Sequence, residues 1–189
     1  IRGETFVTRK ITRATSRIAL GLQNKLYLGN LNSKRDWGHA KDYIEAMWLI
    51  LQQEKAEDFV IATGVTTEIR EFVRTSFKHV GIDMAFKGEG VDEIGYVDGV
   101  DDAVFEAATG QKNQLAIGQE LIFVDPKYFR PTEVELLIGD ATKARTKLGW
   151  SPKYKLQDLV TDMMQSDIKV MQKETYLKDG GFQTKNYFE

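Results

Sequence analysis

One stretch organises the chain, and it reads LGNLNSKRDWGHAKD over residues 28–42. The apolar residues before it predict a short strand over 25–28, and a helix is predicted to begin near His39. An arginine at such a strand-to-helix junction can point its guanidinium into a cleft, and the paired N–H donors of that group suit phosphate oxygens. Arg35 therefore has two interpretations, a phosphate-binding residue or a surface partner of Asp36.

The chain before this stretch predicts a helix over residues 7–20, where apolar side chains recur at helical spacing. Arg9, Arg13 and Arg17 form an i, i+4 row on another side of this helix, and we expect that row to face solvent. Lys10 lies near the helix start, where the positive end of the helix dipole helps to hold an anion.

The chain after it alternates predicted helices with short predicted strands. Residues 40–53 leave little polar face, so this helix is expected to be buried on more than one side. The apolar run 59–63 predicts a buried parallel strand, and Thr66 is expected to cap the helix that follows. Residues 88–118 are rich in glycine and acidic residues, with one helical turn expected around 103–107. The other predicted elements are helices over 69–80, 141–148 and 156–173 and strands over 83–87 and 119–125. This alternation predicts an α/β fold.

A second informative run, YFRPTEVELLIGD, covers residues 128–140. Arg130 precedes Pro131, so its backbone is pushed away from the helical region. Glu133 follows three residues later. The two could form a local salt bridge of small energetic weight. They could instead divide one ligand, with Arg130 on a phosphate and Glu133 accepting hydrogen bonds from the vicinal hydroxyls of a ribose.

Composition narrows the class of protein. Apolar residues make up 42% and charged residues 29% of the 189 residues, which is ordinary for a globular protein. The net charge is −2 and there is no basic tail, so the composition does not indicate nucleic acid as a partner. Cysteine is absent, which excludes disulfides and thiolate metal sites, and the aspartates of residues 88–118 do not match a calcium loop, so we expect no metal. No apolar run approaches the about 18 residues of a membrane helix, and no signal peptide is recognisable, so we expect a cytoplasmic protein.

The two runs, together with FVTRK at residues 6–10, resemble the GDP-mannose 4,6-dehydratases. These are extended short-chain dehydrogenase/reductases at the start of the route from GDP-mannose to GDP-fucose. The pair Arg35-Asp36 alone occurs across nucleotide-sugar epimerases and dehydratases, whereas the longer KRDWGH version at 34–39 is specific. The similarity extends over nearly the entire chain and is weakest over 90–118.

The resemblance implies an NADP-dependent lyase that converts GDP-mannose to GDP-4-keto-6-deoxymannose. It implies two arginines on the diphosphate, a glutamate on the ribose, a valine and a lysine lining the nucleotide site, and an arginine contacting NADP. In this sequence the diphosphate arginines are Arg35 and Arg130, the ribose glutamate is Glu133, the nucleotide-site residues are Val7 and Lys10, and the NADP-contacting residue is Arg2.

The catalytic half of such an enzyme is missing from this sequence. There is no Gly-x-x-Gly-x-x-Gly turn, no tyrosine has a lysine four residues on, and the chain begins at Ile1 without a methionine. The resemblance places the catalytic threonine, glutamate, tyrosine and lysine in the N-terminal half, so no catalytic residue is expected here. We therefore expect a C-terminal fragment that is inactive alone and lacks most of the NADP site.

The resemblance also implies a fold class and domain boundaries. We expect the last strand and helices of a Rossmann sheet plus a small α/β substrate-binding lobe. Residues 1–38 are predicted as the first part of the lobe, 39–80 as the end of the Rossmann domain, and 81–189 as the second part of the lobe, with a variable insertion over 88–118. Apolar surfaces on 40–53 and 59–63 would then be exposed, so we expect a companion N-terminal fragment or a homo-oligomer.

Two other functions stay open at this point. One is a fragment of a nucleotide-sugar epimerase built on the same scaffold, and the KRDWGH run disfavours it. The other is a GDP-sugar-binding module without catalytic activity. The relative affinity for GDP and UDP separates the dehydratase interpretation from the epimerase one.

Overall fold

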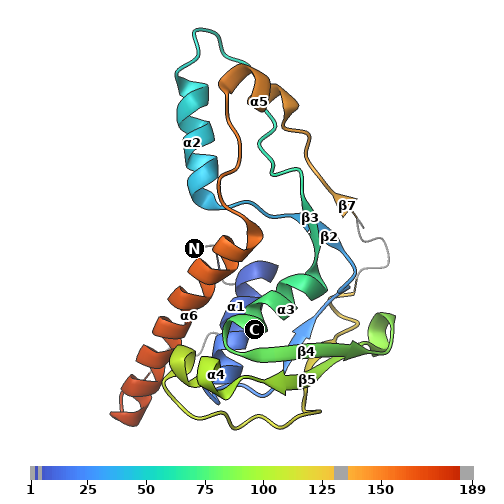
Figure 1. Cartoon of the computed structure of the whole chain (residues 1–189), viewed down its shortest axis with the longest axis vertical. Coiled ribbons are helices and arrows are strands. Elements are labelled where there is room, and N and C mark those ends of the chain that lie inside the picture. Colours follow the sequence, from blue (N-terminus) through green and yellow to red (C-terminus); the bar gives the residue numbers. More distant parts are fainter. Residues whose placement is uncertain (1–2, 4–5, 130–135, 184–189) are drawn as a thin grey trace.

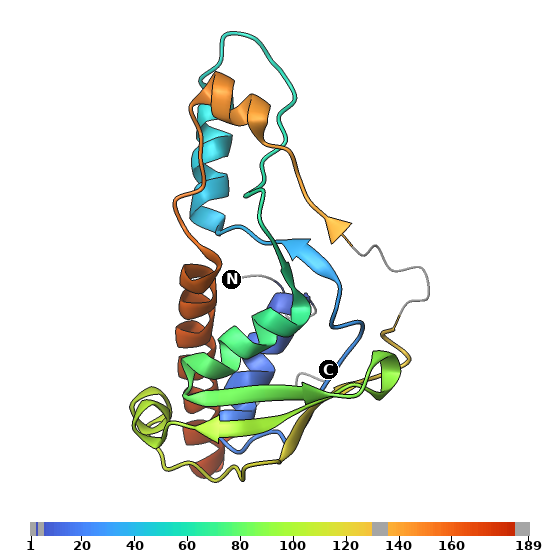
Figure 2. The same ribbon diagram turned by 45° about the vertical axis from the view of Figure 1, so that its right-hand side comes forward.

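A four-stranded sheet with helices on one side forms the larger part of the molecule (Figures 1 and 2). The computed structural model describes residues 3, 6–129 and 136–183. The sheet has the order β1-β6-β5-β4, in which β1 and β6 are parallel and the other neighbours antiparallel. Its strands are β1 (Leu26–Leu28), β4 (Ile82–Lys87), β5 (Ile94–Val100) and β6 (Glu120–Val124). The helical elements of this part are α1 (Val7–Ala19), α3 (Ile69–His79), the short helix η1 (Gly90–Asp92), α4 (Asp102–Thr109) and α6 (Leu156–Asp179).

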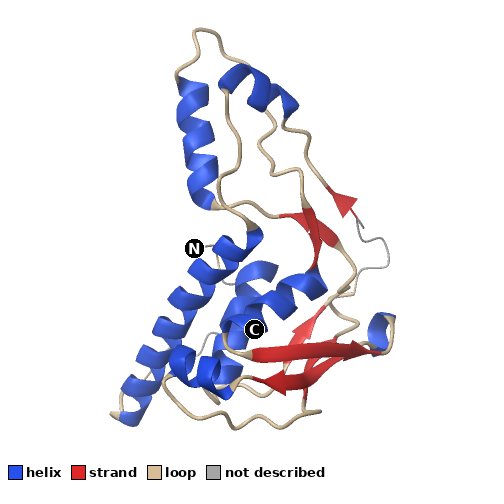
Figure 3. Cartoon of the chain, viewed as in Figure 1, coloured by secondary structure: helices blue, strands red, loops and turns tan. Residues whose placement is uncertain are grey.

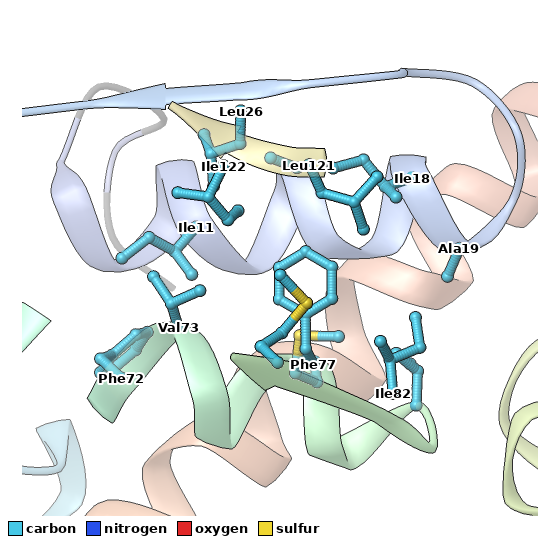
Figure 4. Packing of buried hydrophobic residues seen from close by; sticks show 14 of the residues in the cluster. Ile11, Ile18, Ala19, Leu26, Phe72, Val73, Phe77, Ile82, Leu121 and Ile122 are labelled. Carbon is cyan, nitrogen blue, oxygen red and sulfur yellow. The ribbon is translucent and has the colours of Figure 1, made fainter. Parts of the chain in front are cut away.

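The main hydrophobic core lies between this sheet and helices α1, α3 and α6 (Figure 4). Ile11 of α1 and Phe77 of α3 are fully buried against Leu121 and Ile122 of β6. The helical spacing of the apolar residues on α1 and α3 turns one face of each helix toward the sheet, which explains why both helices form here. Burial of such side chains stabilises the fold by roughly 1.5–3 kcal/mol each.

A second, smaller unit lies at the other end of the molecule (Figure 1). Its three short strands have the order β3-β2-β7, with β2 antiparallel to β3 and parallel to β7. A separate cluster, which includes Ala46 and Trp150, joins its two helices. The elements of this unit are β2 (Lys34–Asp36), α2 (Ala40–Leu51), β3 (Thr66–Glu68), β7 (Leu136–Leu137) and α5 (Thr142–Leu148).

Several sequence predictions are confirmed by these elements. The helix predicted over 7–20 is α1, the helix over 69–80 is α3, and the strand over 119–125 is β6. His39 is the N-cap of α2, and its ring nitrogen Nδ1 accepts a hydrogen bond from the Lys41 N–H. Helix α6 is longer than predicted and continues to Asp179.

Two predictions around the second unit are wrong. The run 59–63 lies in the long loop between α2 and β3 and forms no strand with any described residue (Figure 3). Thr66 does not cap α3, because it belongs to β3. The first N–H groups of α3 donate instead to backbone carbonyls, Ile69 N to Ser33 O at 3.1 Å and Arg70 N to Leu31 O at 3.1 Å, so a side-chain cap is unnecessary.

Helix α2 is far more exposed than predicted. Ala46 is fully buried, but Trp48 is 60% and Leu51 80% exposed, together with Ile44 and Met47. The expectation of exposed apolar surface on residues 40–53 is thereby confirmed for the chain on its own. The corresponding face of α2 is called the outer face below and consists of Ile44, Met47, Trp48 and Leu51.

The arginine row on α1 does not face solvent, contrary to the prediction. Arg9 Nε donates to Asp167 of α6 at 3.3 Å, and Arg17 Nη1 donates to Glu174 at 3.1 Å. Arg13 is only 3% exposed. The reason is that the long helix α6 covers this side of α1 and supplies carboxylates to it, which the spacing of one helix cannot reveal.

The segment 39–80, predicted as one piece of a Rossmann domain, is divided between the two cores. Helix α2 packs in the smaller cluster with α5, whereas Phe72, Val73 and Phe77 of α3 belong to the main core. The segment 88–118 supplies η1, β5 and α4 and so forms part of the main sheet. The assignment of these segments to domains of a longer enzyme stays a prediction.

Candidate anion site between the two sheets

Lys10 lies beside the carboxyl ends of the two parallel strands β1 and β6. Its ammonium nitrogen Nζ is 4.1 Å from the centroid of the Tyr128 ring. A turn after β6 places this tyrosine, because Asp125 N donates to Leu28 O at 2.9 Å and Tyr128 N donates to Asp125 O at 2.9 Å. Clefts beyond the carboxyl ends of parallel strands are common ligand sites in α/β proteins.

Arg35 lies in the middle of β2. This strand pairs with β7, which belongs to the run 128–140 that begins with Tyr128. In the parallel register of β2 and β7, Lys34 stands opposite Leu136 and Arg35 opposite Leu137. Arg35 Nη1 also donates to the Lys34 carbonyl oxygen at 2.8 Å. The run 128–140 therefore contacts Lys10 at Tyr128 and pairs with Arg35 through Leu137 of β7, which lies beside β2 (Figure 1).

The structure thus makes two contacts between segments that are far apart in the sequence. The first turns of α1 contact the start of the run 128–140 at Tyr128, and β2 pairs with the continuation of that run in β7. Of the predicted site residues, Lys10 takes part in the first contact and Arg35 in the second. Arg2, Arg130 and Glu133 lie outside the described residues.

Val7, the remaining predicted site residue, opens α1 and is half-buried. It packs against the main hydrophobic core. It lies three residues before Lys10, so both belong to neighbouring positions on one side of the helix. The core thereby holds the start of α1 in place beneath the lysine.

The carboxylate of Asp36, the neighbour of Arg35, accepts hydrogen bonds from the loop before β3. Its Oδ1 accepts hydrogen bonds from Thr63 Oγ1 at 2.6 Å and Thr63 N at 3.1 Å, and its Oδ2 accepts one from Gly64 N at 2.8 Å. Asp36 thus ties β2 to the loop before β3, which steadies the backbone that carries Arg35.

Asp140, at the far end of the run, is a local structural residue. Its Oδ1 accepts hydrogen bonds from the backbone N–H and the hydroxyl of Thr142, at 2.9 and 2.6 Å. The hydroxyl bond, followed by the backbone bond, lowers the pKa of this carboxyl below its usual range. The sequence run also predicts Asp140 as the cap of α5, and this prediction is wrong, because the helix begins at Thr142 and its N-cap is Ala141, without a side-chain capping bond.

A cavity of about 540 Å³ lies next to this region, between the start of α1, the loop after β2 and the first turns of α6. Neither Lys10 nor Arg35 lines it. Thr8, which is 2% exposed, does, and its hydroxyl has no hydrogen-bond partner among the described residues. On the opposite wall, His39 Nε2 and Asp162 Oδ2 are 3.1 Å apart. The lining residues with apolar side chains include Trp37, Ala40, Leu159 and Met163.

Sequence reasoning did not identify the contact between Lys10 and Tyr128 or the pairing of β2 with β7. Tyr128 opens the second run, but nothing in the spacing of the sequence links it to α1. Within residues 6–129 and 136–183, no group of three or more potential metal-binding side chains comes together. No helix in these ranges has the length and apolar character needed to cross a membrane.

Residues 1–163 match the family model described as GDP-mannose 4,6 dehydratase. The chain is 51% identical over 181 residues to the GDP-mannose 4,6-dehydratase of Yersinia enterocolitica, covering 96% of this chain and 47% of that protein. It is 45% identical over 170 residues to the human GDP-mannose 4,6 dehydratase, covering 90% and 41% respectively.

Among solved structures, RMD from Pseudomonas aeruginosa in complex with NADPH is similar with a TM-score of 0.62 at 18% identity. The match covers 89% of this chain and 44% of that one. UDP-glucose 4-epimerase from Thermotoga maritima, in complex with UDP-glucose, matches with a TM-score of 0.56 at 20% identity, over 90% and 41% of the two chains. These likenesses show a shared fold.

The chain spans about half the length of the curated relatives that it matches. The match to the family model nevertheless runs through all three segments that border the candidate anion site, including the whole of residues 128–140. By this match and by its identity to the relatives, the chain belongs to the GDP-mannose 4,6-dehydratase family.

Proposed function

We propose that this chain is the GDP-sugar-binding portion of a GDP-mannose 4,6-dehydratase, a hydro-lyase that converts GDP-mannose to GDP-4-keto-6-deoxymannose. In this proposal Arg35 and Arg130 hold the diphosphate, assisted by Lys10. Glu133 holds the ribose, and Val7 lines the nucleotide site.

The observation that carries the proposal is the course of the run 128–140. Its first residue, Tyr128, lies against Lys10, and its later residues Leu136 and Leu137 pair with the strand of Arg35. A run that begins at one cation and continues beside another is well placed to complete a site for a ligand with several negative charges. Arginine suits such a site because its planar fork binds phosphate oxygens in pairs, and lysine adds a mobile point charge.

The residues of this chain would form only the edge of a cofactor site. The sequence has no Gly-rich dinucleotide-binding turn and no Tyr-x-x-x-Lys pair, and Arg2, the proposed NADP contact, lies outside the described residues. NADP would accept the hydride from the sugar and return it. The residues of this chain would bind and orient the nucleotide, and the chain alone is proposed to be inactive.

The remaining half of the enzyme is proposed to dock on the smaller unit. The outer face of α2 is apolar and exposed, and Ala40 and Tyr43 on the same helix line the neighbouring cavity. The apolar run 59–63 has no strand partner among the described residues, and Val60 is 54% exposed. Unpartnered apolar surface and unpaired extended backbone of this kind are covered by a companion chain or by a second copy of the same chain.

Calorimetric titration of the 189-residue chain with GDP and with UDP tests the nucleotide-binding proposal. GDP is expected to bind more tightly than UDP, and Arg35→Ala is expected to weaken GDP binding by about tenfold or more, as loss of a charged hydrogen-bonding partner does. Arg74→Ala is the matched control, because Arg74 is a half-buried arginine that pairs with Glu71 on α3. Equal affinity for the two nucleotides, or equal effects of the two substitutions, would contradict the proposal. Preference for UDP would favour the epimerase alternative.

A further inference from the structure

Glu93 is a buried carboxylate in the segment 88–118, and neither the fold nor the proposed site accounts for it. It is 3% exposed at the start of β5. Its Oε1 accepts a hydrogen bond from Arg70 Nε at 2.8 Å and lies 2.6 Å from Arg70 Nη2. A carboxylate this deeply buried is costly unless a cation satisfies it, so the pair forms one unit.

Arg70 extends this unit to the stretch that carries Arg35. Its Nη2 donates to Asn32 Oδ1 at 2.6 Å, and its Nη1 donates to Glu68 Oε2 at 3.2 Å. Its backbone N–H donates to the Leu31 carbonyl at 3.1 Å. One residue at the start of α3 thus holds the turn before β2 and the end of β3 at the same time.

The ladder of β2 and β3 shows on which face this support acts. Lys34 stands opposite Glu68 and Arg35 opposite Thr67. Side chains alternate along a strand, so Lys34 and Glu68 share one face, and Arg35 and Thr67 share the other. Lys34 Nζ is 3.9 Å from Glu68 Oε1, which confirms the pairing on the first face. Arg70 and Glu93 therefore support the strand from the face opposite Arg35.

We propose that Arg70 and Glu93 are positioning residues, which hold the turn at Asn32 and the strand β2 so that Arg35 is presented to the nucleotide diphosphate. Arg70 itself does not bind the nucleotide, because its guanidinium is engaged by Glu93, Glu68 and Asn32. The inference rests on the proposed function, since it concerns the same anion site. It gives the segment 88–118 a role in that site without direct contact with the ligand.

The two substitutions that test it are Glu93→Gln and Arg70→Lys. Glu93→Gln keeps the size and a hydrogen-bond acceptor but removes the negative charge, and Arg70→Lys keeps the positive charge but loses the fork that reaches three partners. Each is expected to weaken GDP binding by about three- to tenfold, in the range by which supporting networks modulate a site. Glu120→Gln is the matched control, because Glu120 pairs with Lys87 on the same sheet in an exposed position.

A double-mutant cycle with Arg35→Ala separates positioning from general stability. If Glu93 acts through Arg35, Glu93→Gln should weaken GDP binding by less than about twofold when Arg35 is already alanine. A merely structural role would lower the melting temperature of Glu93→Gln and Arg70→Lys and leave the GDP affinity of the folded protein unchanged. That result, or a full effect of Glu93→Gln in the Arg35→Ala background, would overturn the inference.

The controls also distinguish this failure from failure of the proposed function. If the unsubstituted chain does not bind GDP, or if Arg35→Ala leaves its affinity unchanged, the proposed function fails and the inference with it. If the chain binds GDP and Arg35→Ala weakens binding while Glu93→Gln and Arg70→Lys do not, only the positioning role is overturned. Should Glu93→Gln fail to fold, the same cycle with Arg70→Lys decides the matter.

Discussion

Lys10 lies in the first turn of α1, against the aromatic ring of Tyr128. The Tyr128 ring lies 4.1 Å from its ammonium group, and the side chain is half-buried. The ring quadrupole attracts an ammonium group held over the face of an aromatic ring, and this attraction restrains the position of the lysine side chain.

Lys10→Ala is therefore expected to weaken GDP binding by about five- to tenfold, less than the loss of an arginine fork, because lysine contributes a single point charge. Calorimetric titration measures this. Lys78→Ala serves as the control, because Lys78 pairs with Asp83 on an exposed surface. An effect of Lys10→Ala no greater than that of the control would remove Lys10 from the site.

His79, at the last turn of α3, makes the stability of the chain depend on pH. Burial lowers the pKa of its imidazole below the usual range. The unfolded chain therefore takes up a proton at higher pH than the folded chain, so His79 stabilises the fold above its unfolded pKa of about 6.5 and this contribution is lost as the pH falls below that value. The free energy of unfolding should fall between about pH 8 and pH 5.5 more steeply in the parent than in His79→Gln. Denaturant titrations at both pH values test this, and parallel pH profiles would contradict it.

Among the secondary-structure elements, the turn after β6 depends on a close approach at Gly29. A methyl group at this position would overlap the Tyr128 carbonyl oxygen. Gly29→Ala is expected to lower the free energy of unfolding by about 1–3 kcal/mol and to move the start of the run 128–140 away from Lys10. Gly99→Ala is the control, because the added methyl group would meet only Asp83 at 3.6 Å. Thermal denaturation compares the two variants, and equal stability would show that the close approach is not required.

The sequence predicts a helix or strand well where the apolar periodicity of that segment alone determines the element. Helices α1 and α3 have apolar residues at helical spacing, and both were located to within a residue or two. Strand β5 was missed because Gly95, Asp98 and Gly99 interrupt its pattern, and its place comes from its neighbours β4 and β6. The strand predicted at 59–63 does not form, since an apolar run needs a partner strand that the described part of the chain does not supply.

The candidate site was predicted from motifs, and its geometry depends on contacts between motifs. Arg35 and Lys10 were identified as residues suited to phosphate, but neither periodicity nor spacing could place β2 beside β7. The buried pair of Arg70 and Glu93 was not predicted at all. It joins residues 23 positions apart, and each alone reads as an ordinary surface charge.

For the whole molecule, the exposed outer face of α2 is expected to determine whether the chain self-associates. The 189-residue chain is expected to self-associate in solution through this face unless a companion half covers it. The double substitution Trp48→Ser and Leu51→Lys should shift the chain toward monomer in light scattering. Tyr176→Ser is the control, because Tyr176 is 79% exposed on α6, away from the smaller unit. An unchanged molar mass for the double variant would exclude this face as the contact.

The account depends most on the claim that cations from separate parts of the chain meet one diphosphate. Arg130 tests it most directly, because it lies in the run that begins under Lys10 and continues beside Arg35. In a calorimetric titration with GDP, Arg130→Ala is predicted to lose about 2–4 kcal/mol of binding free energy, or about 30- to 800-fold in affinity. A loss smaller than about threefold would contradict the claim.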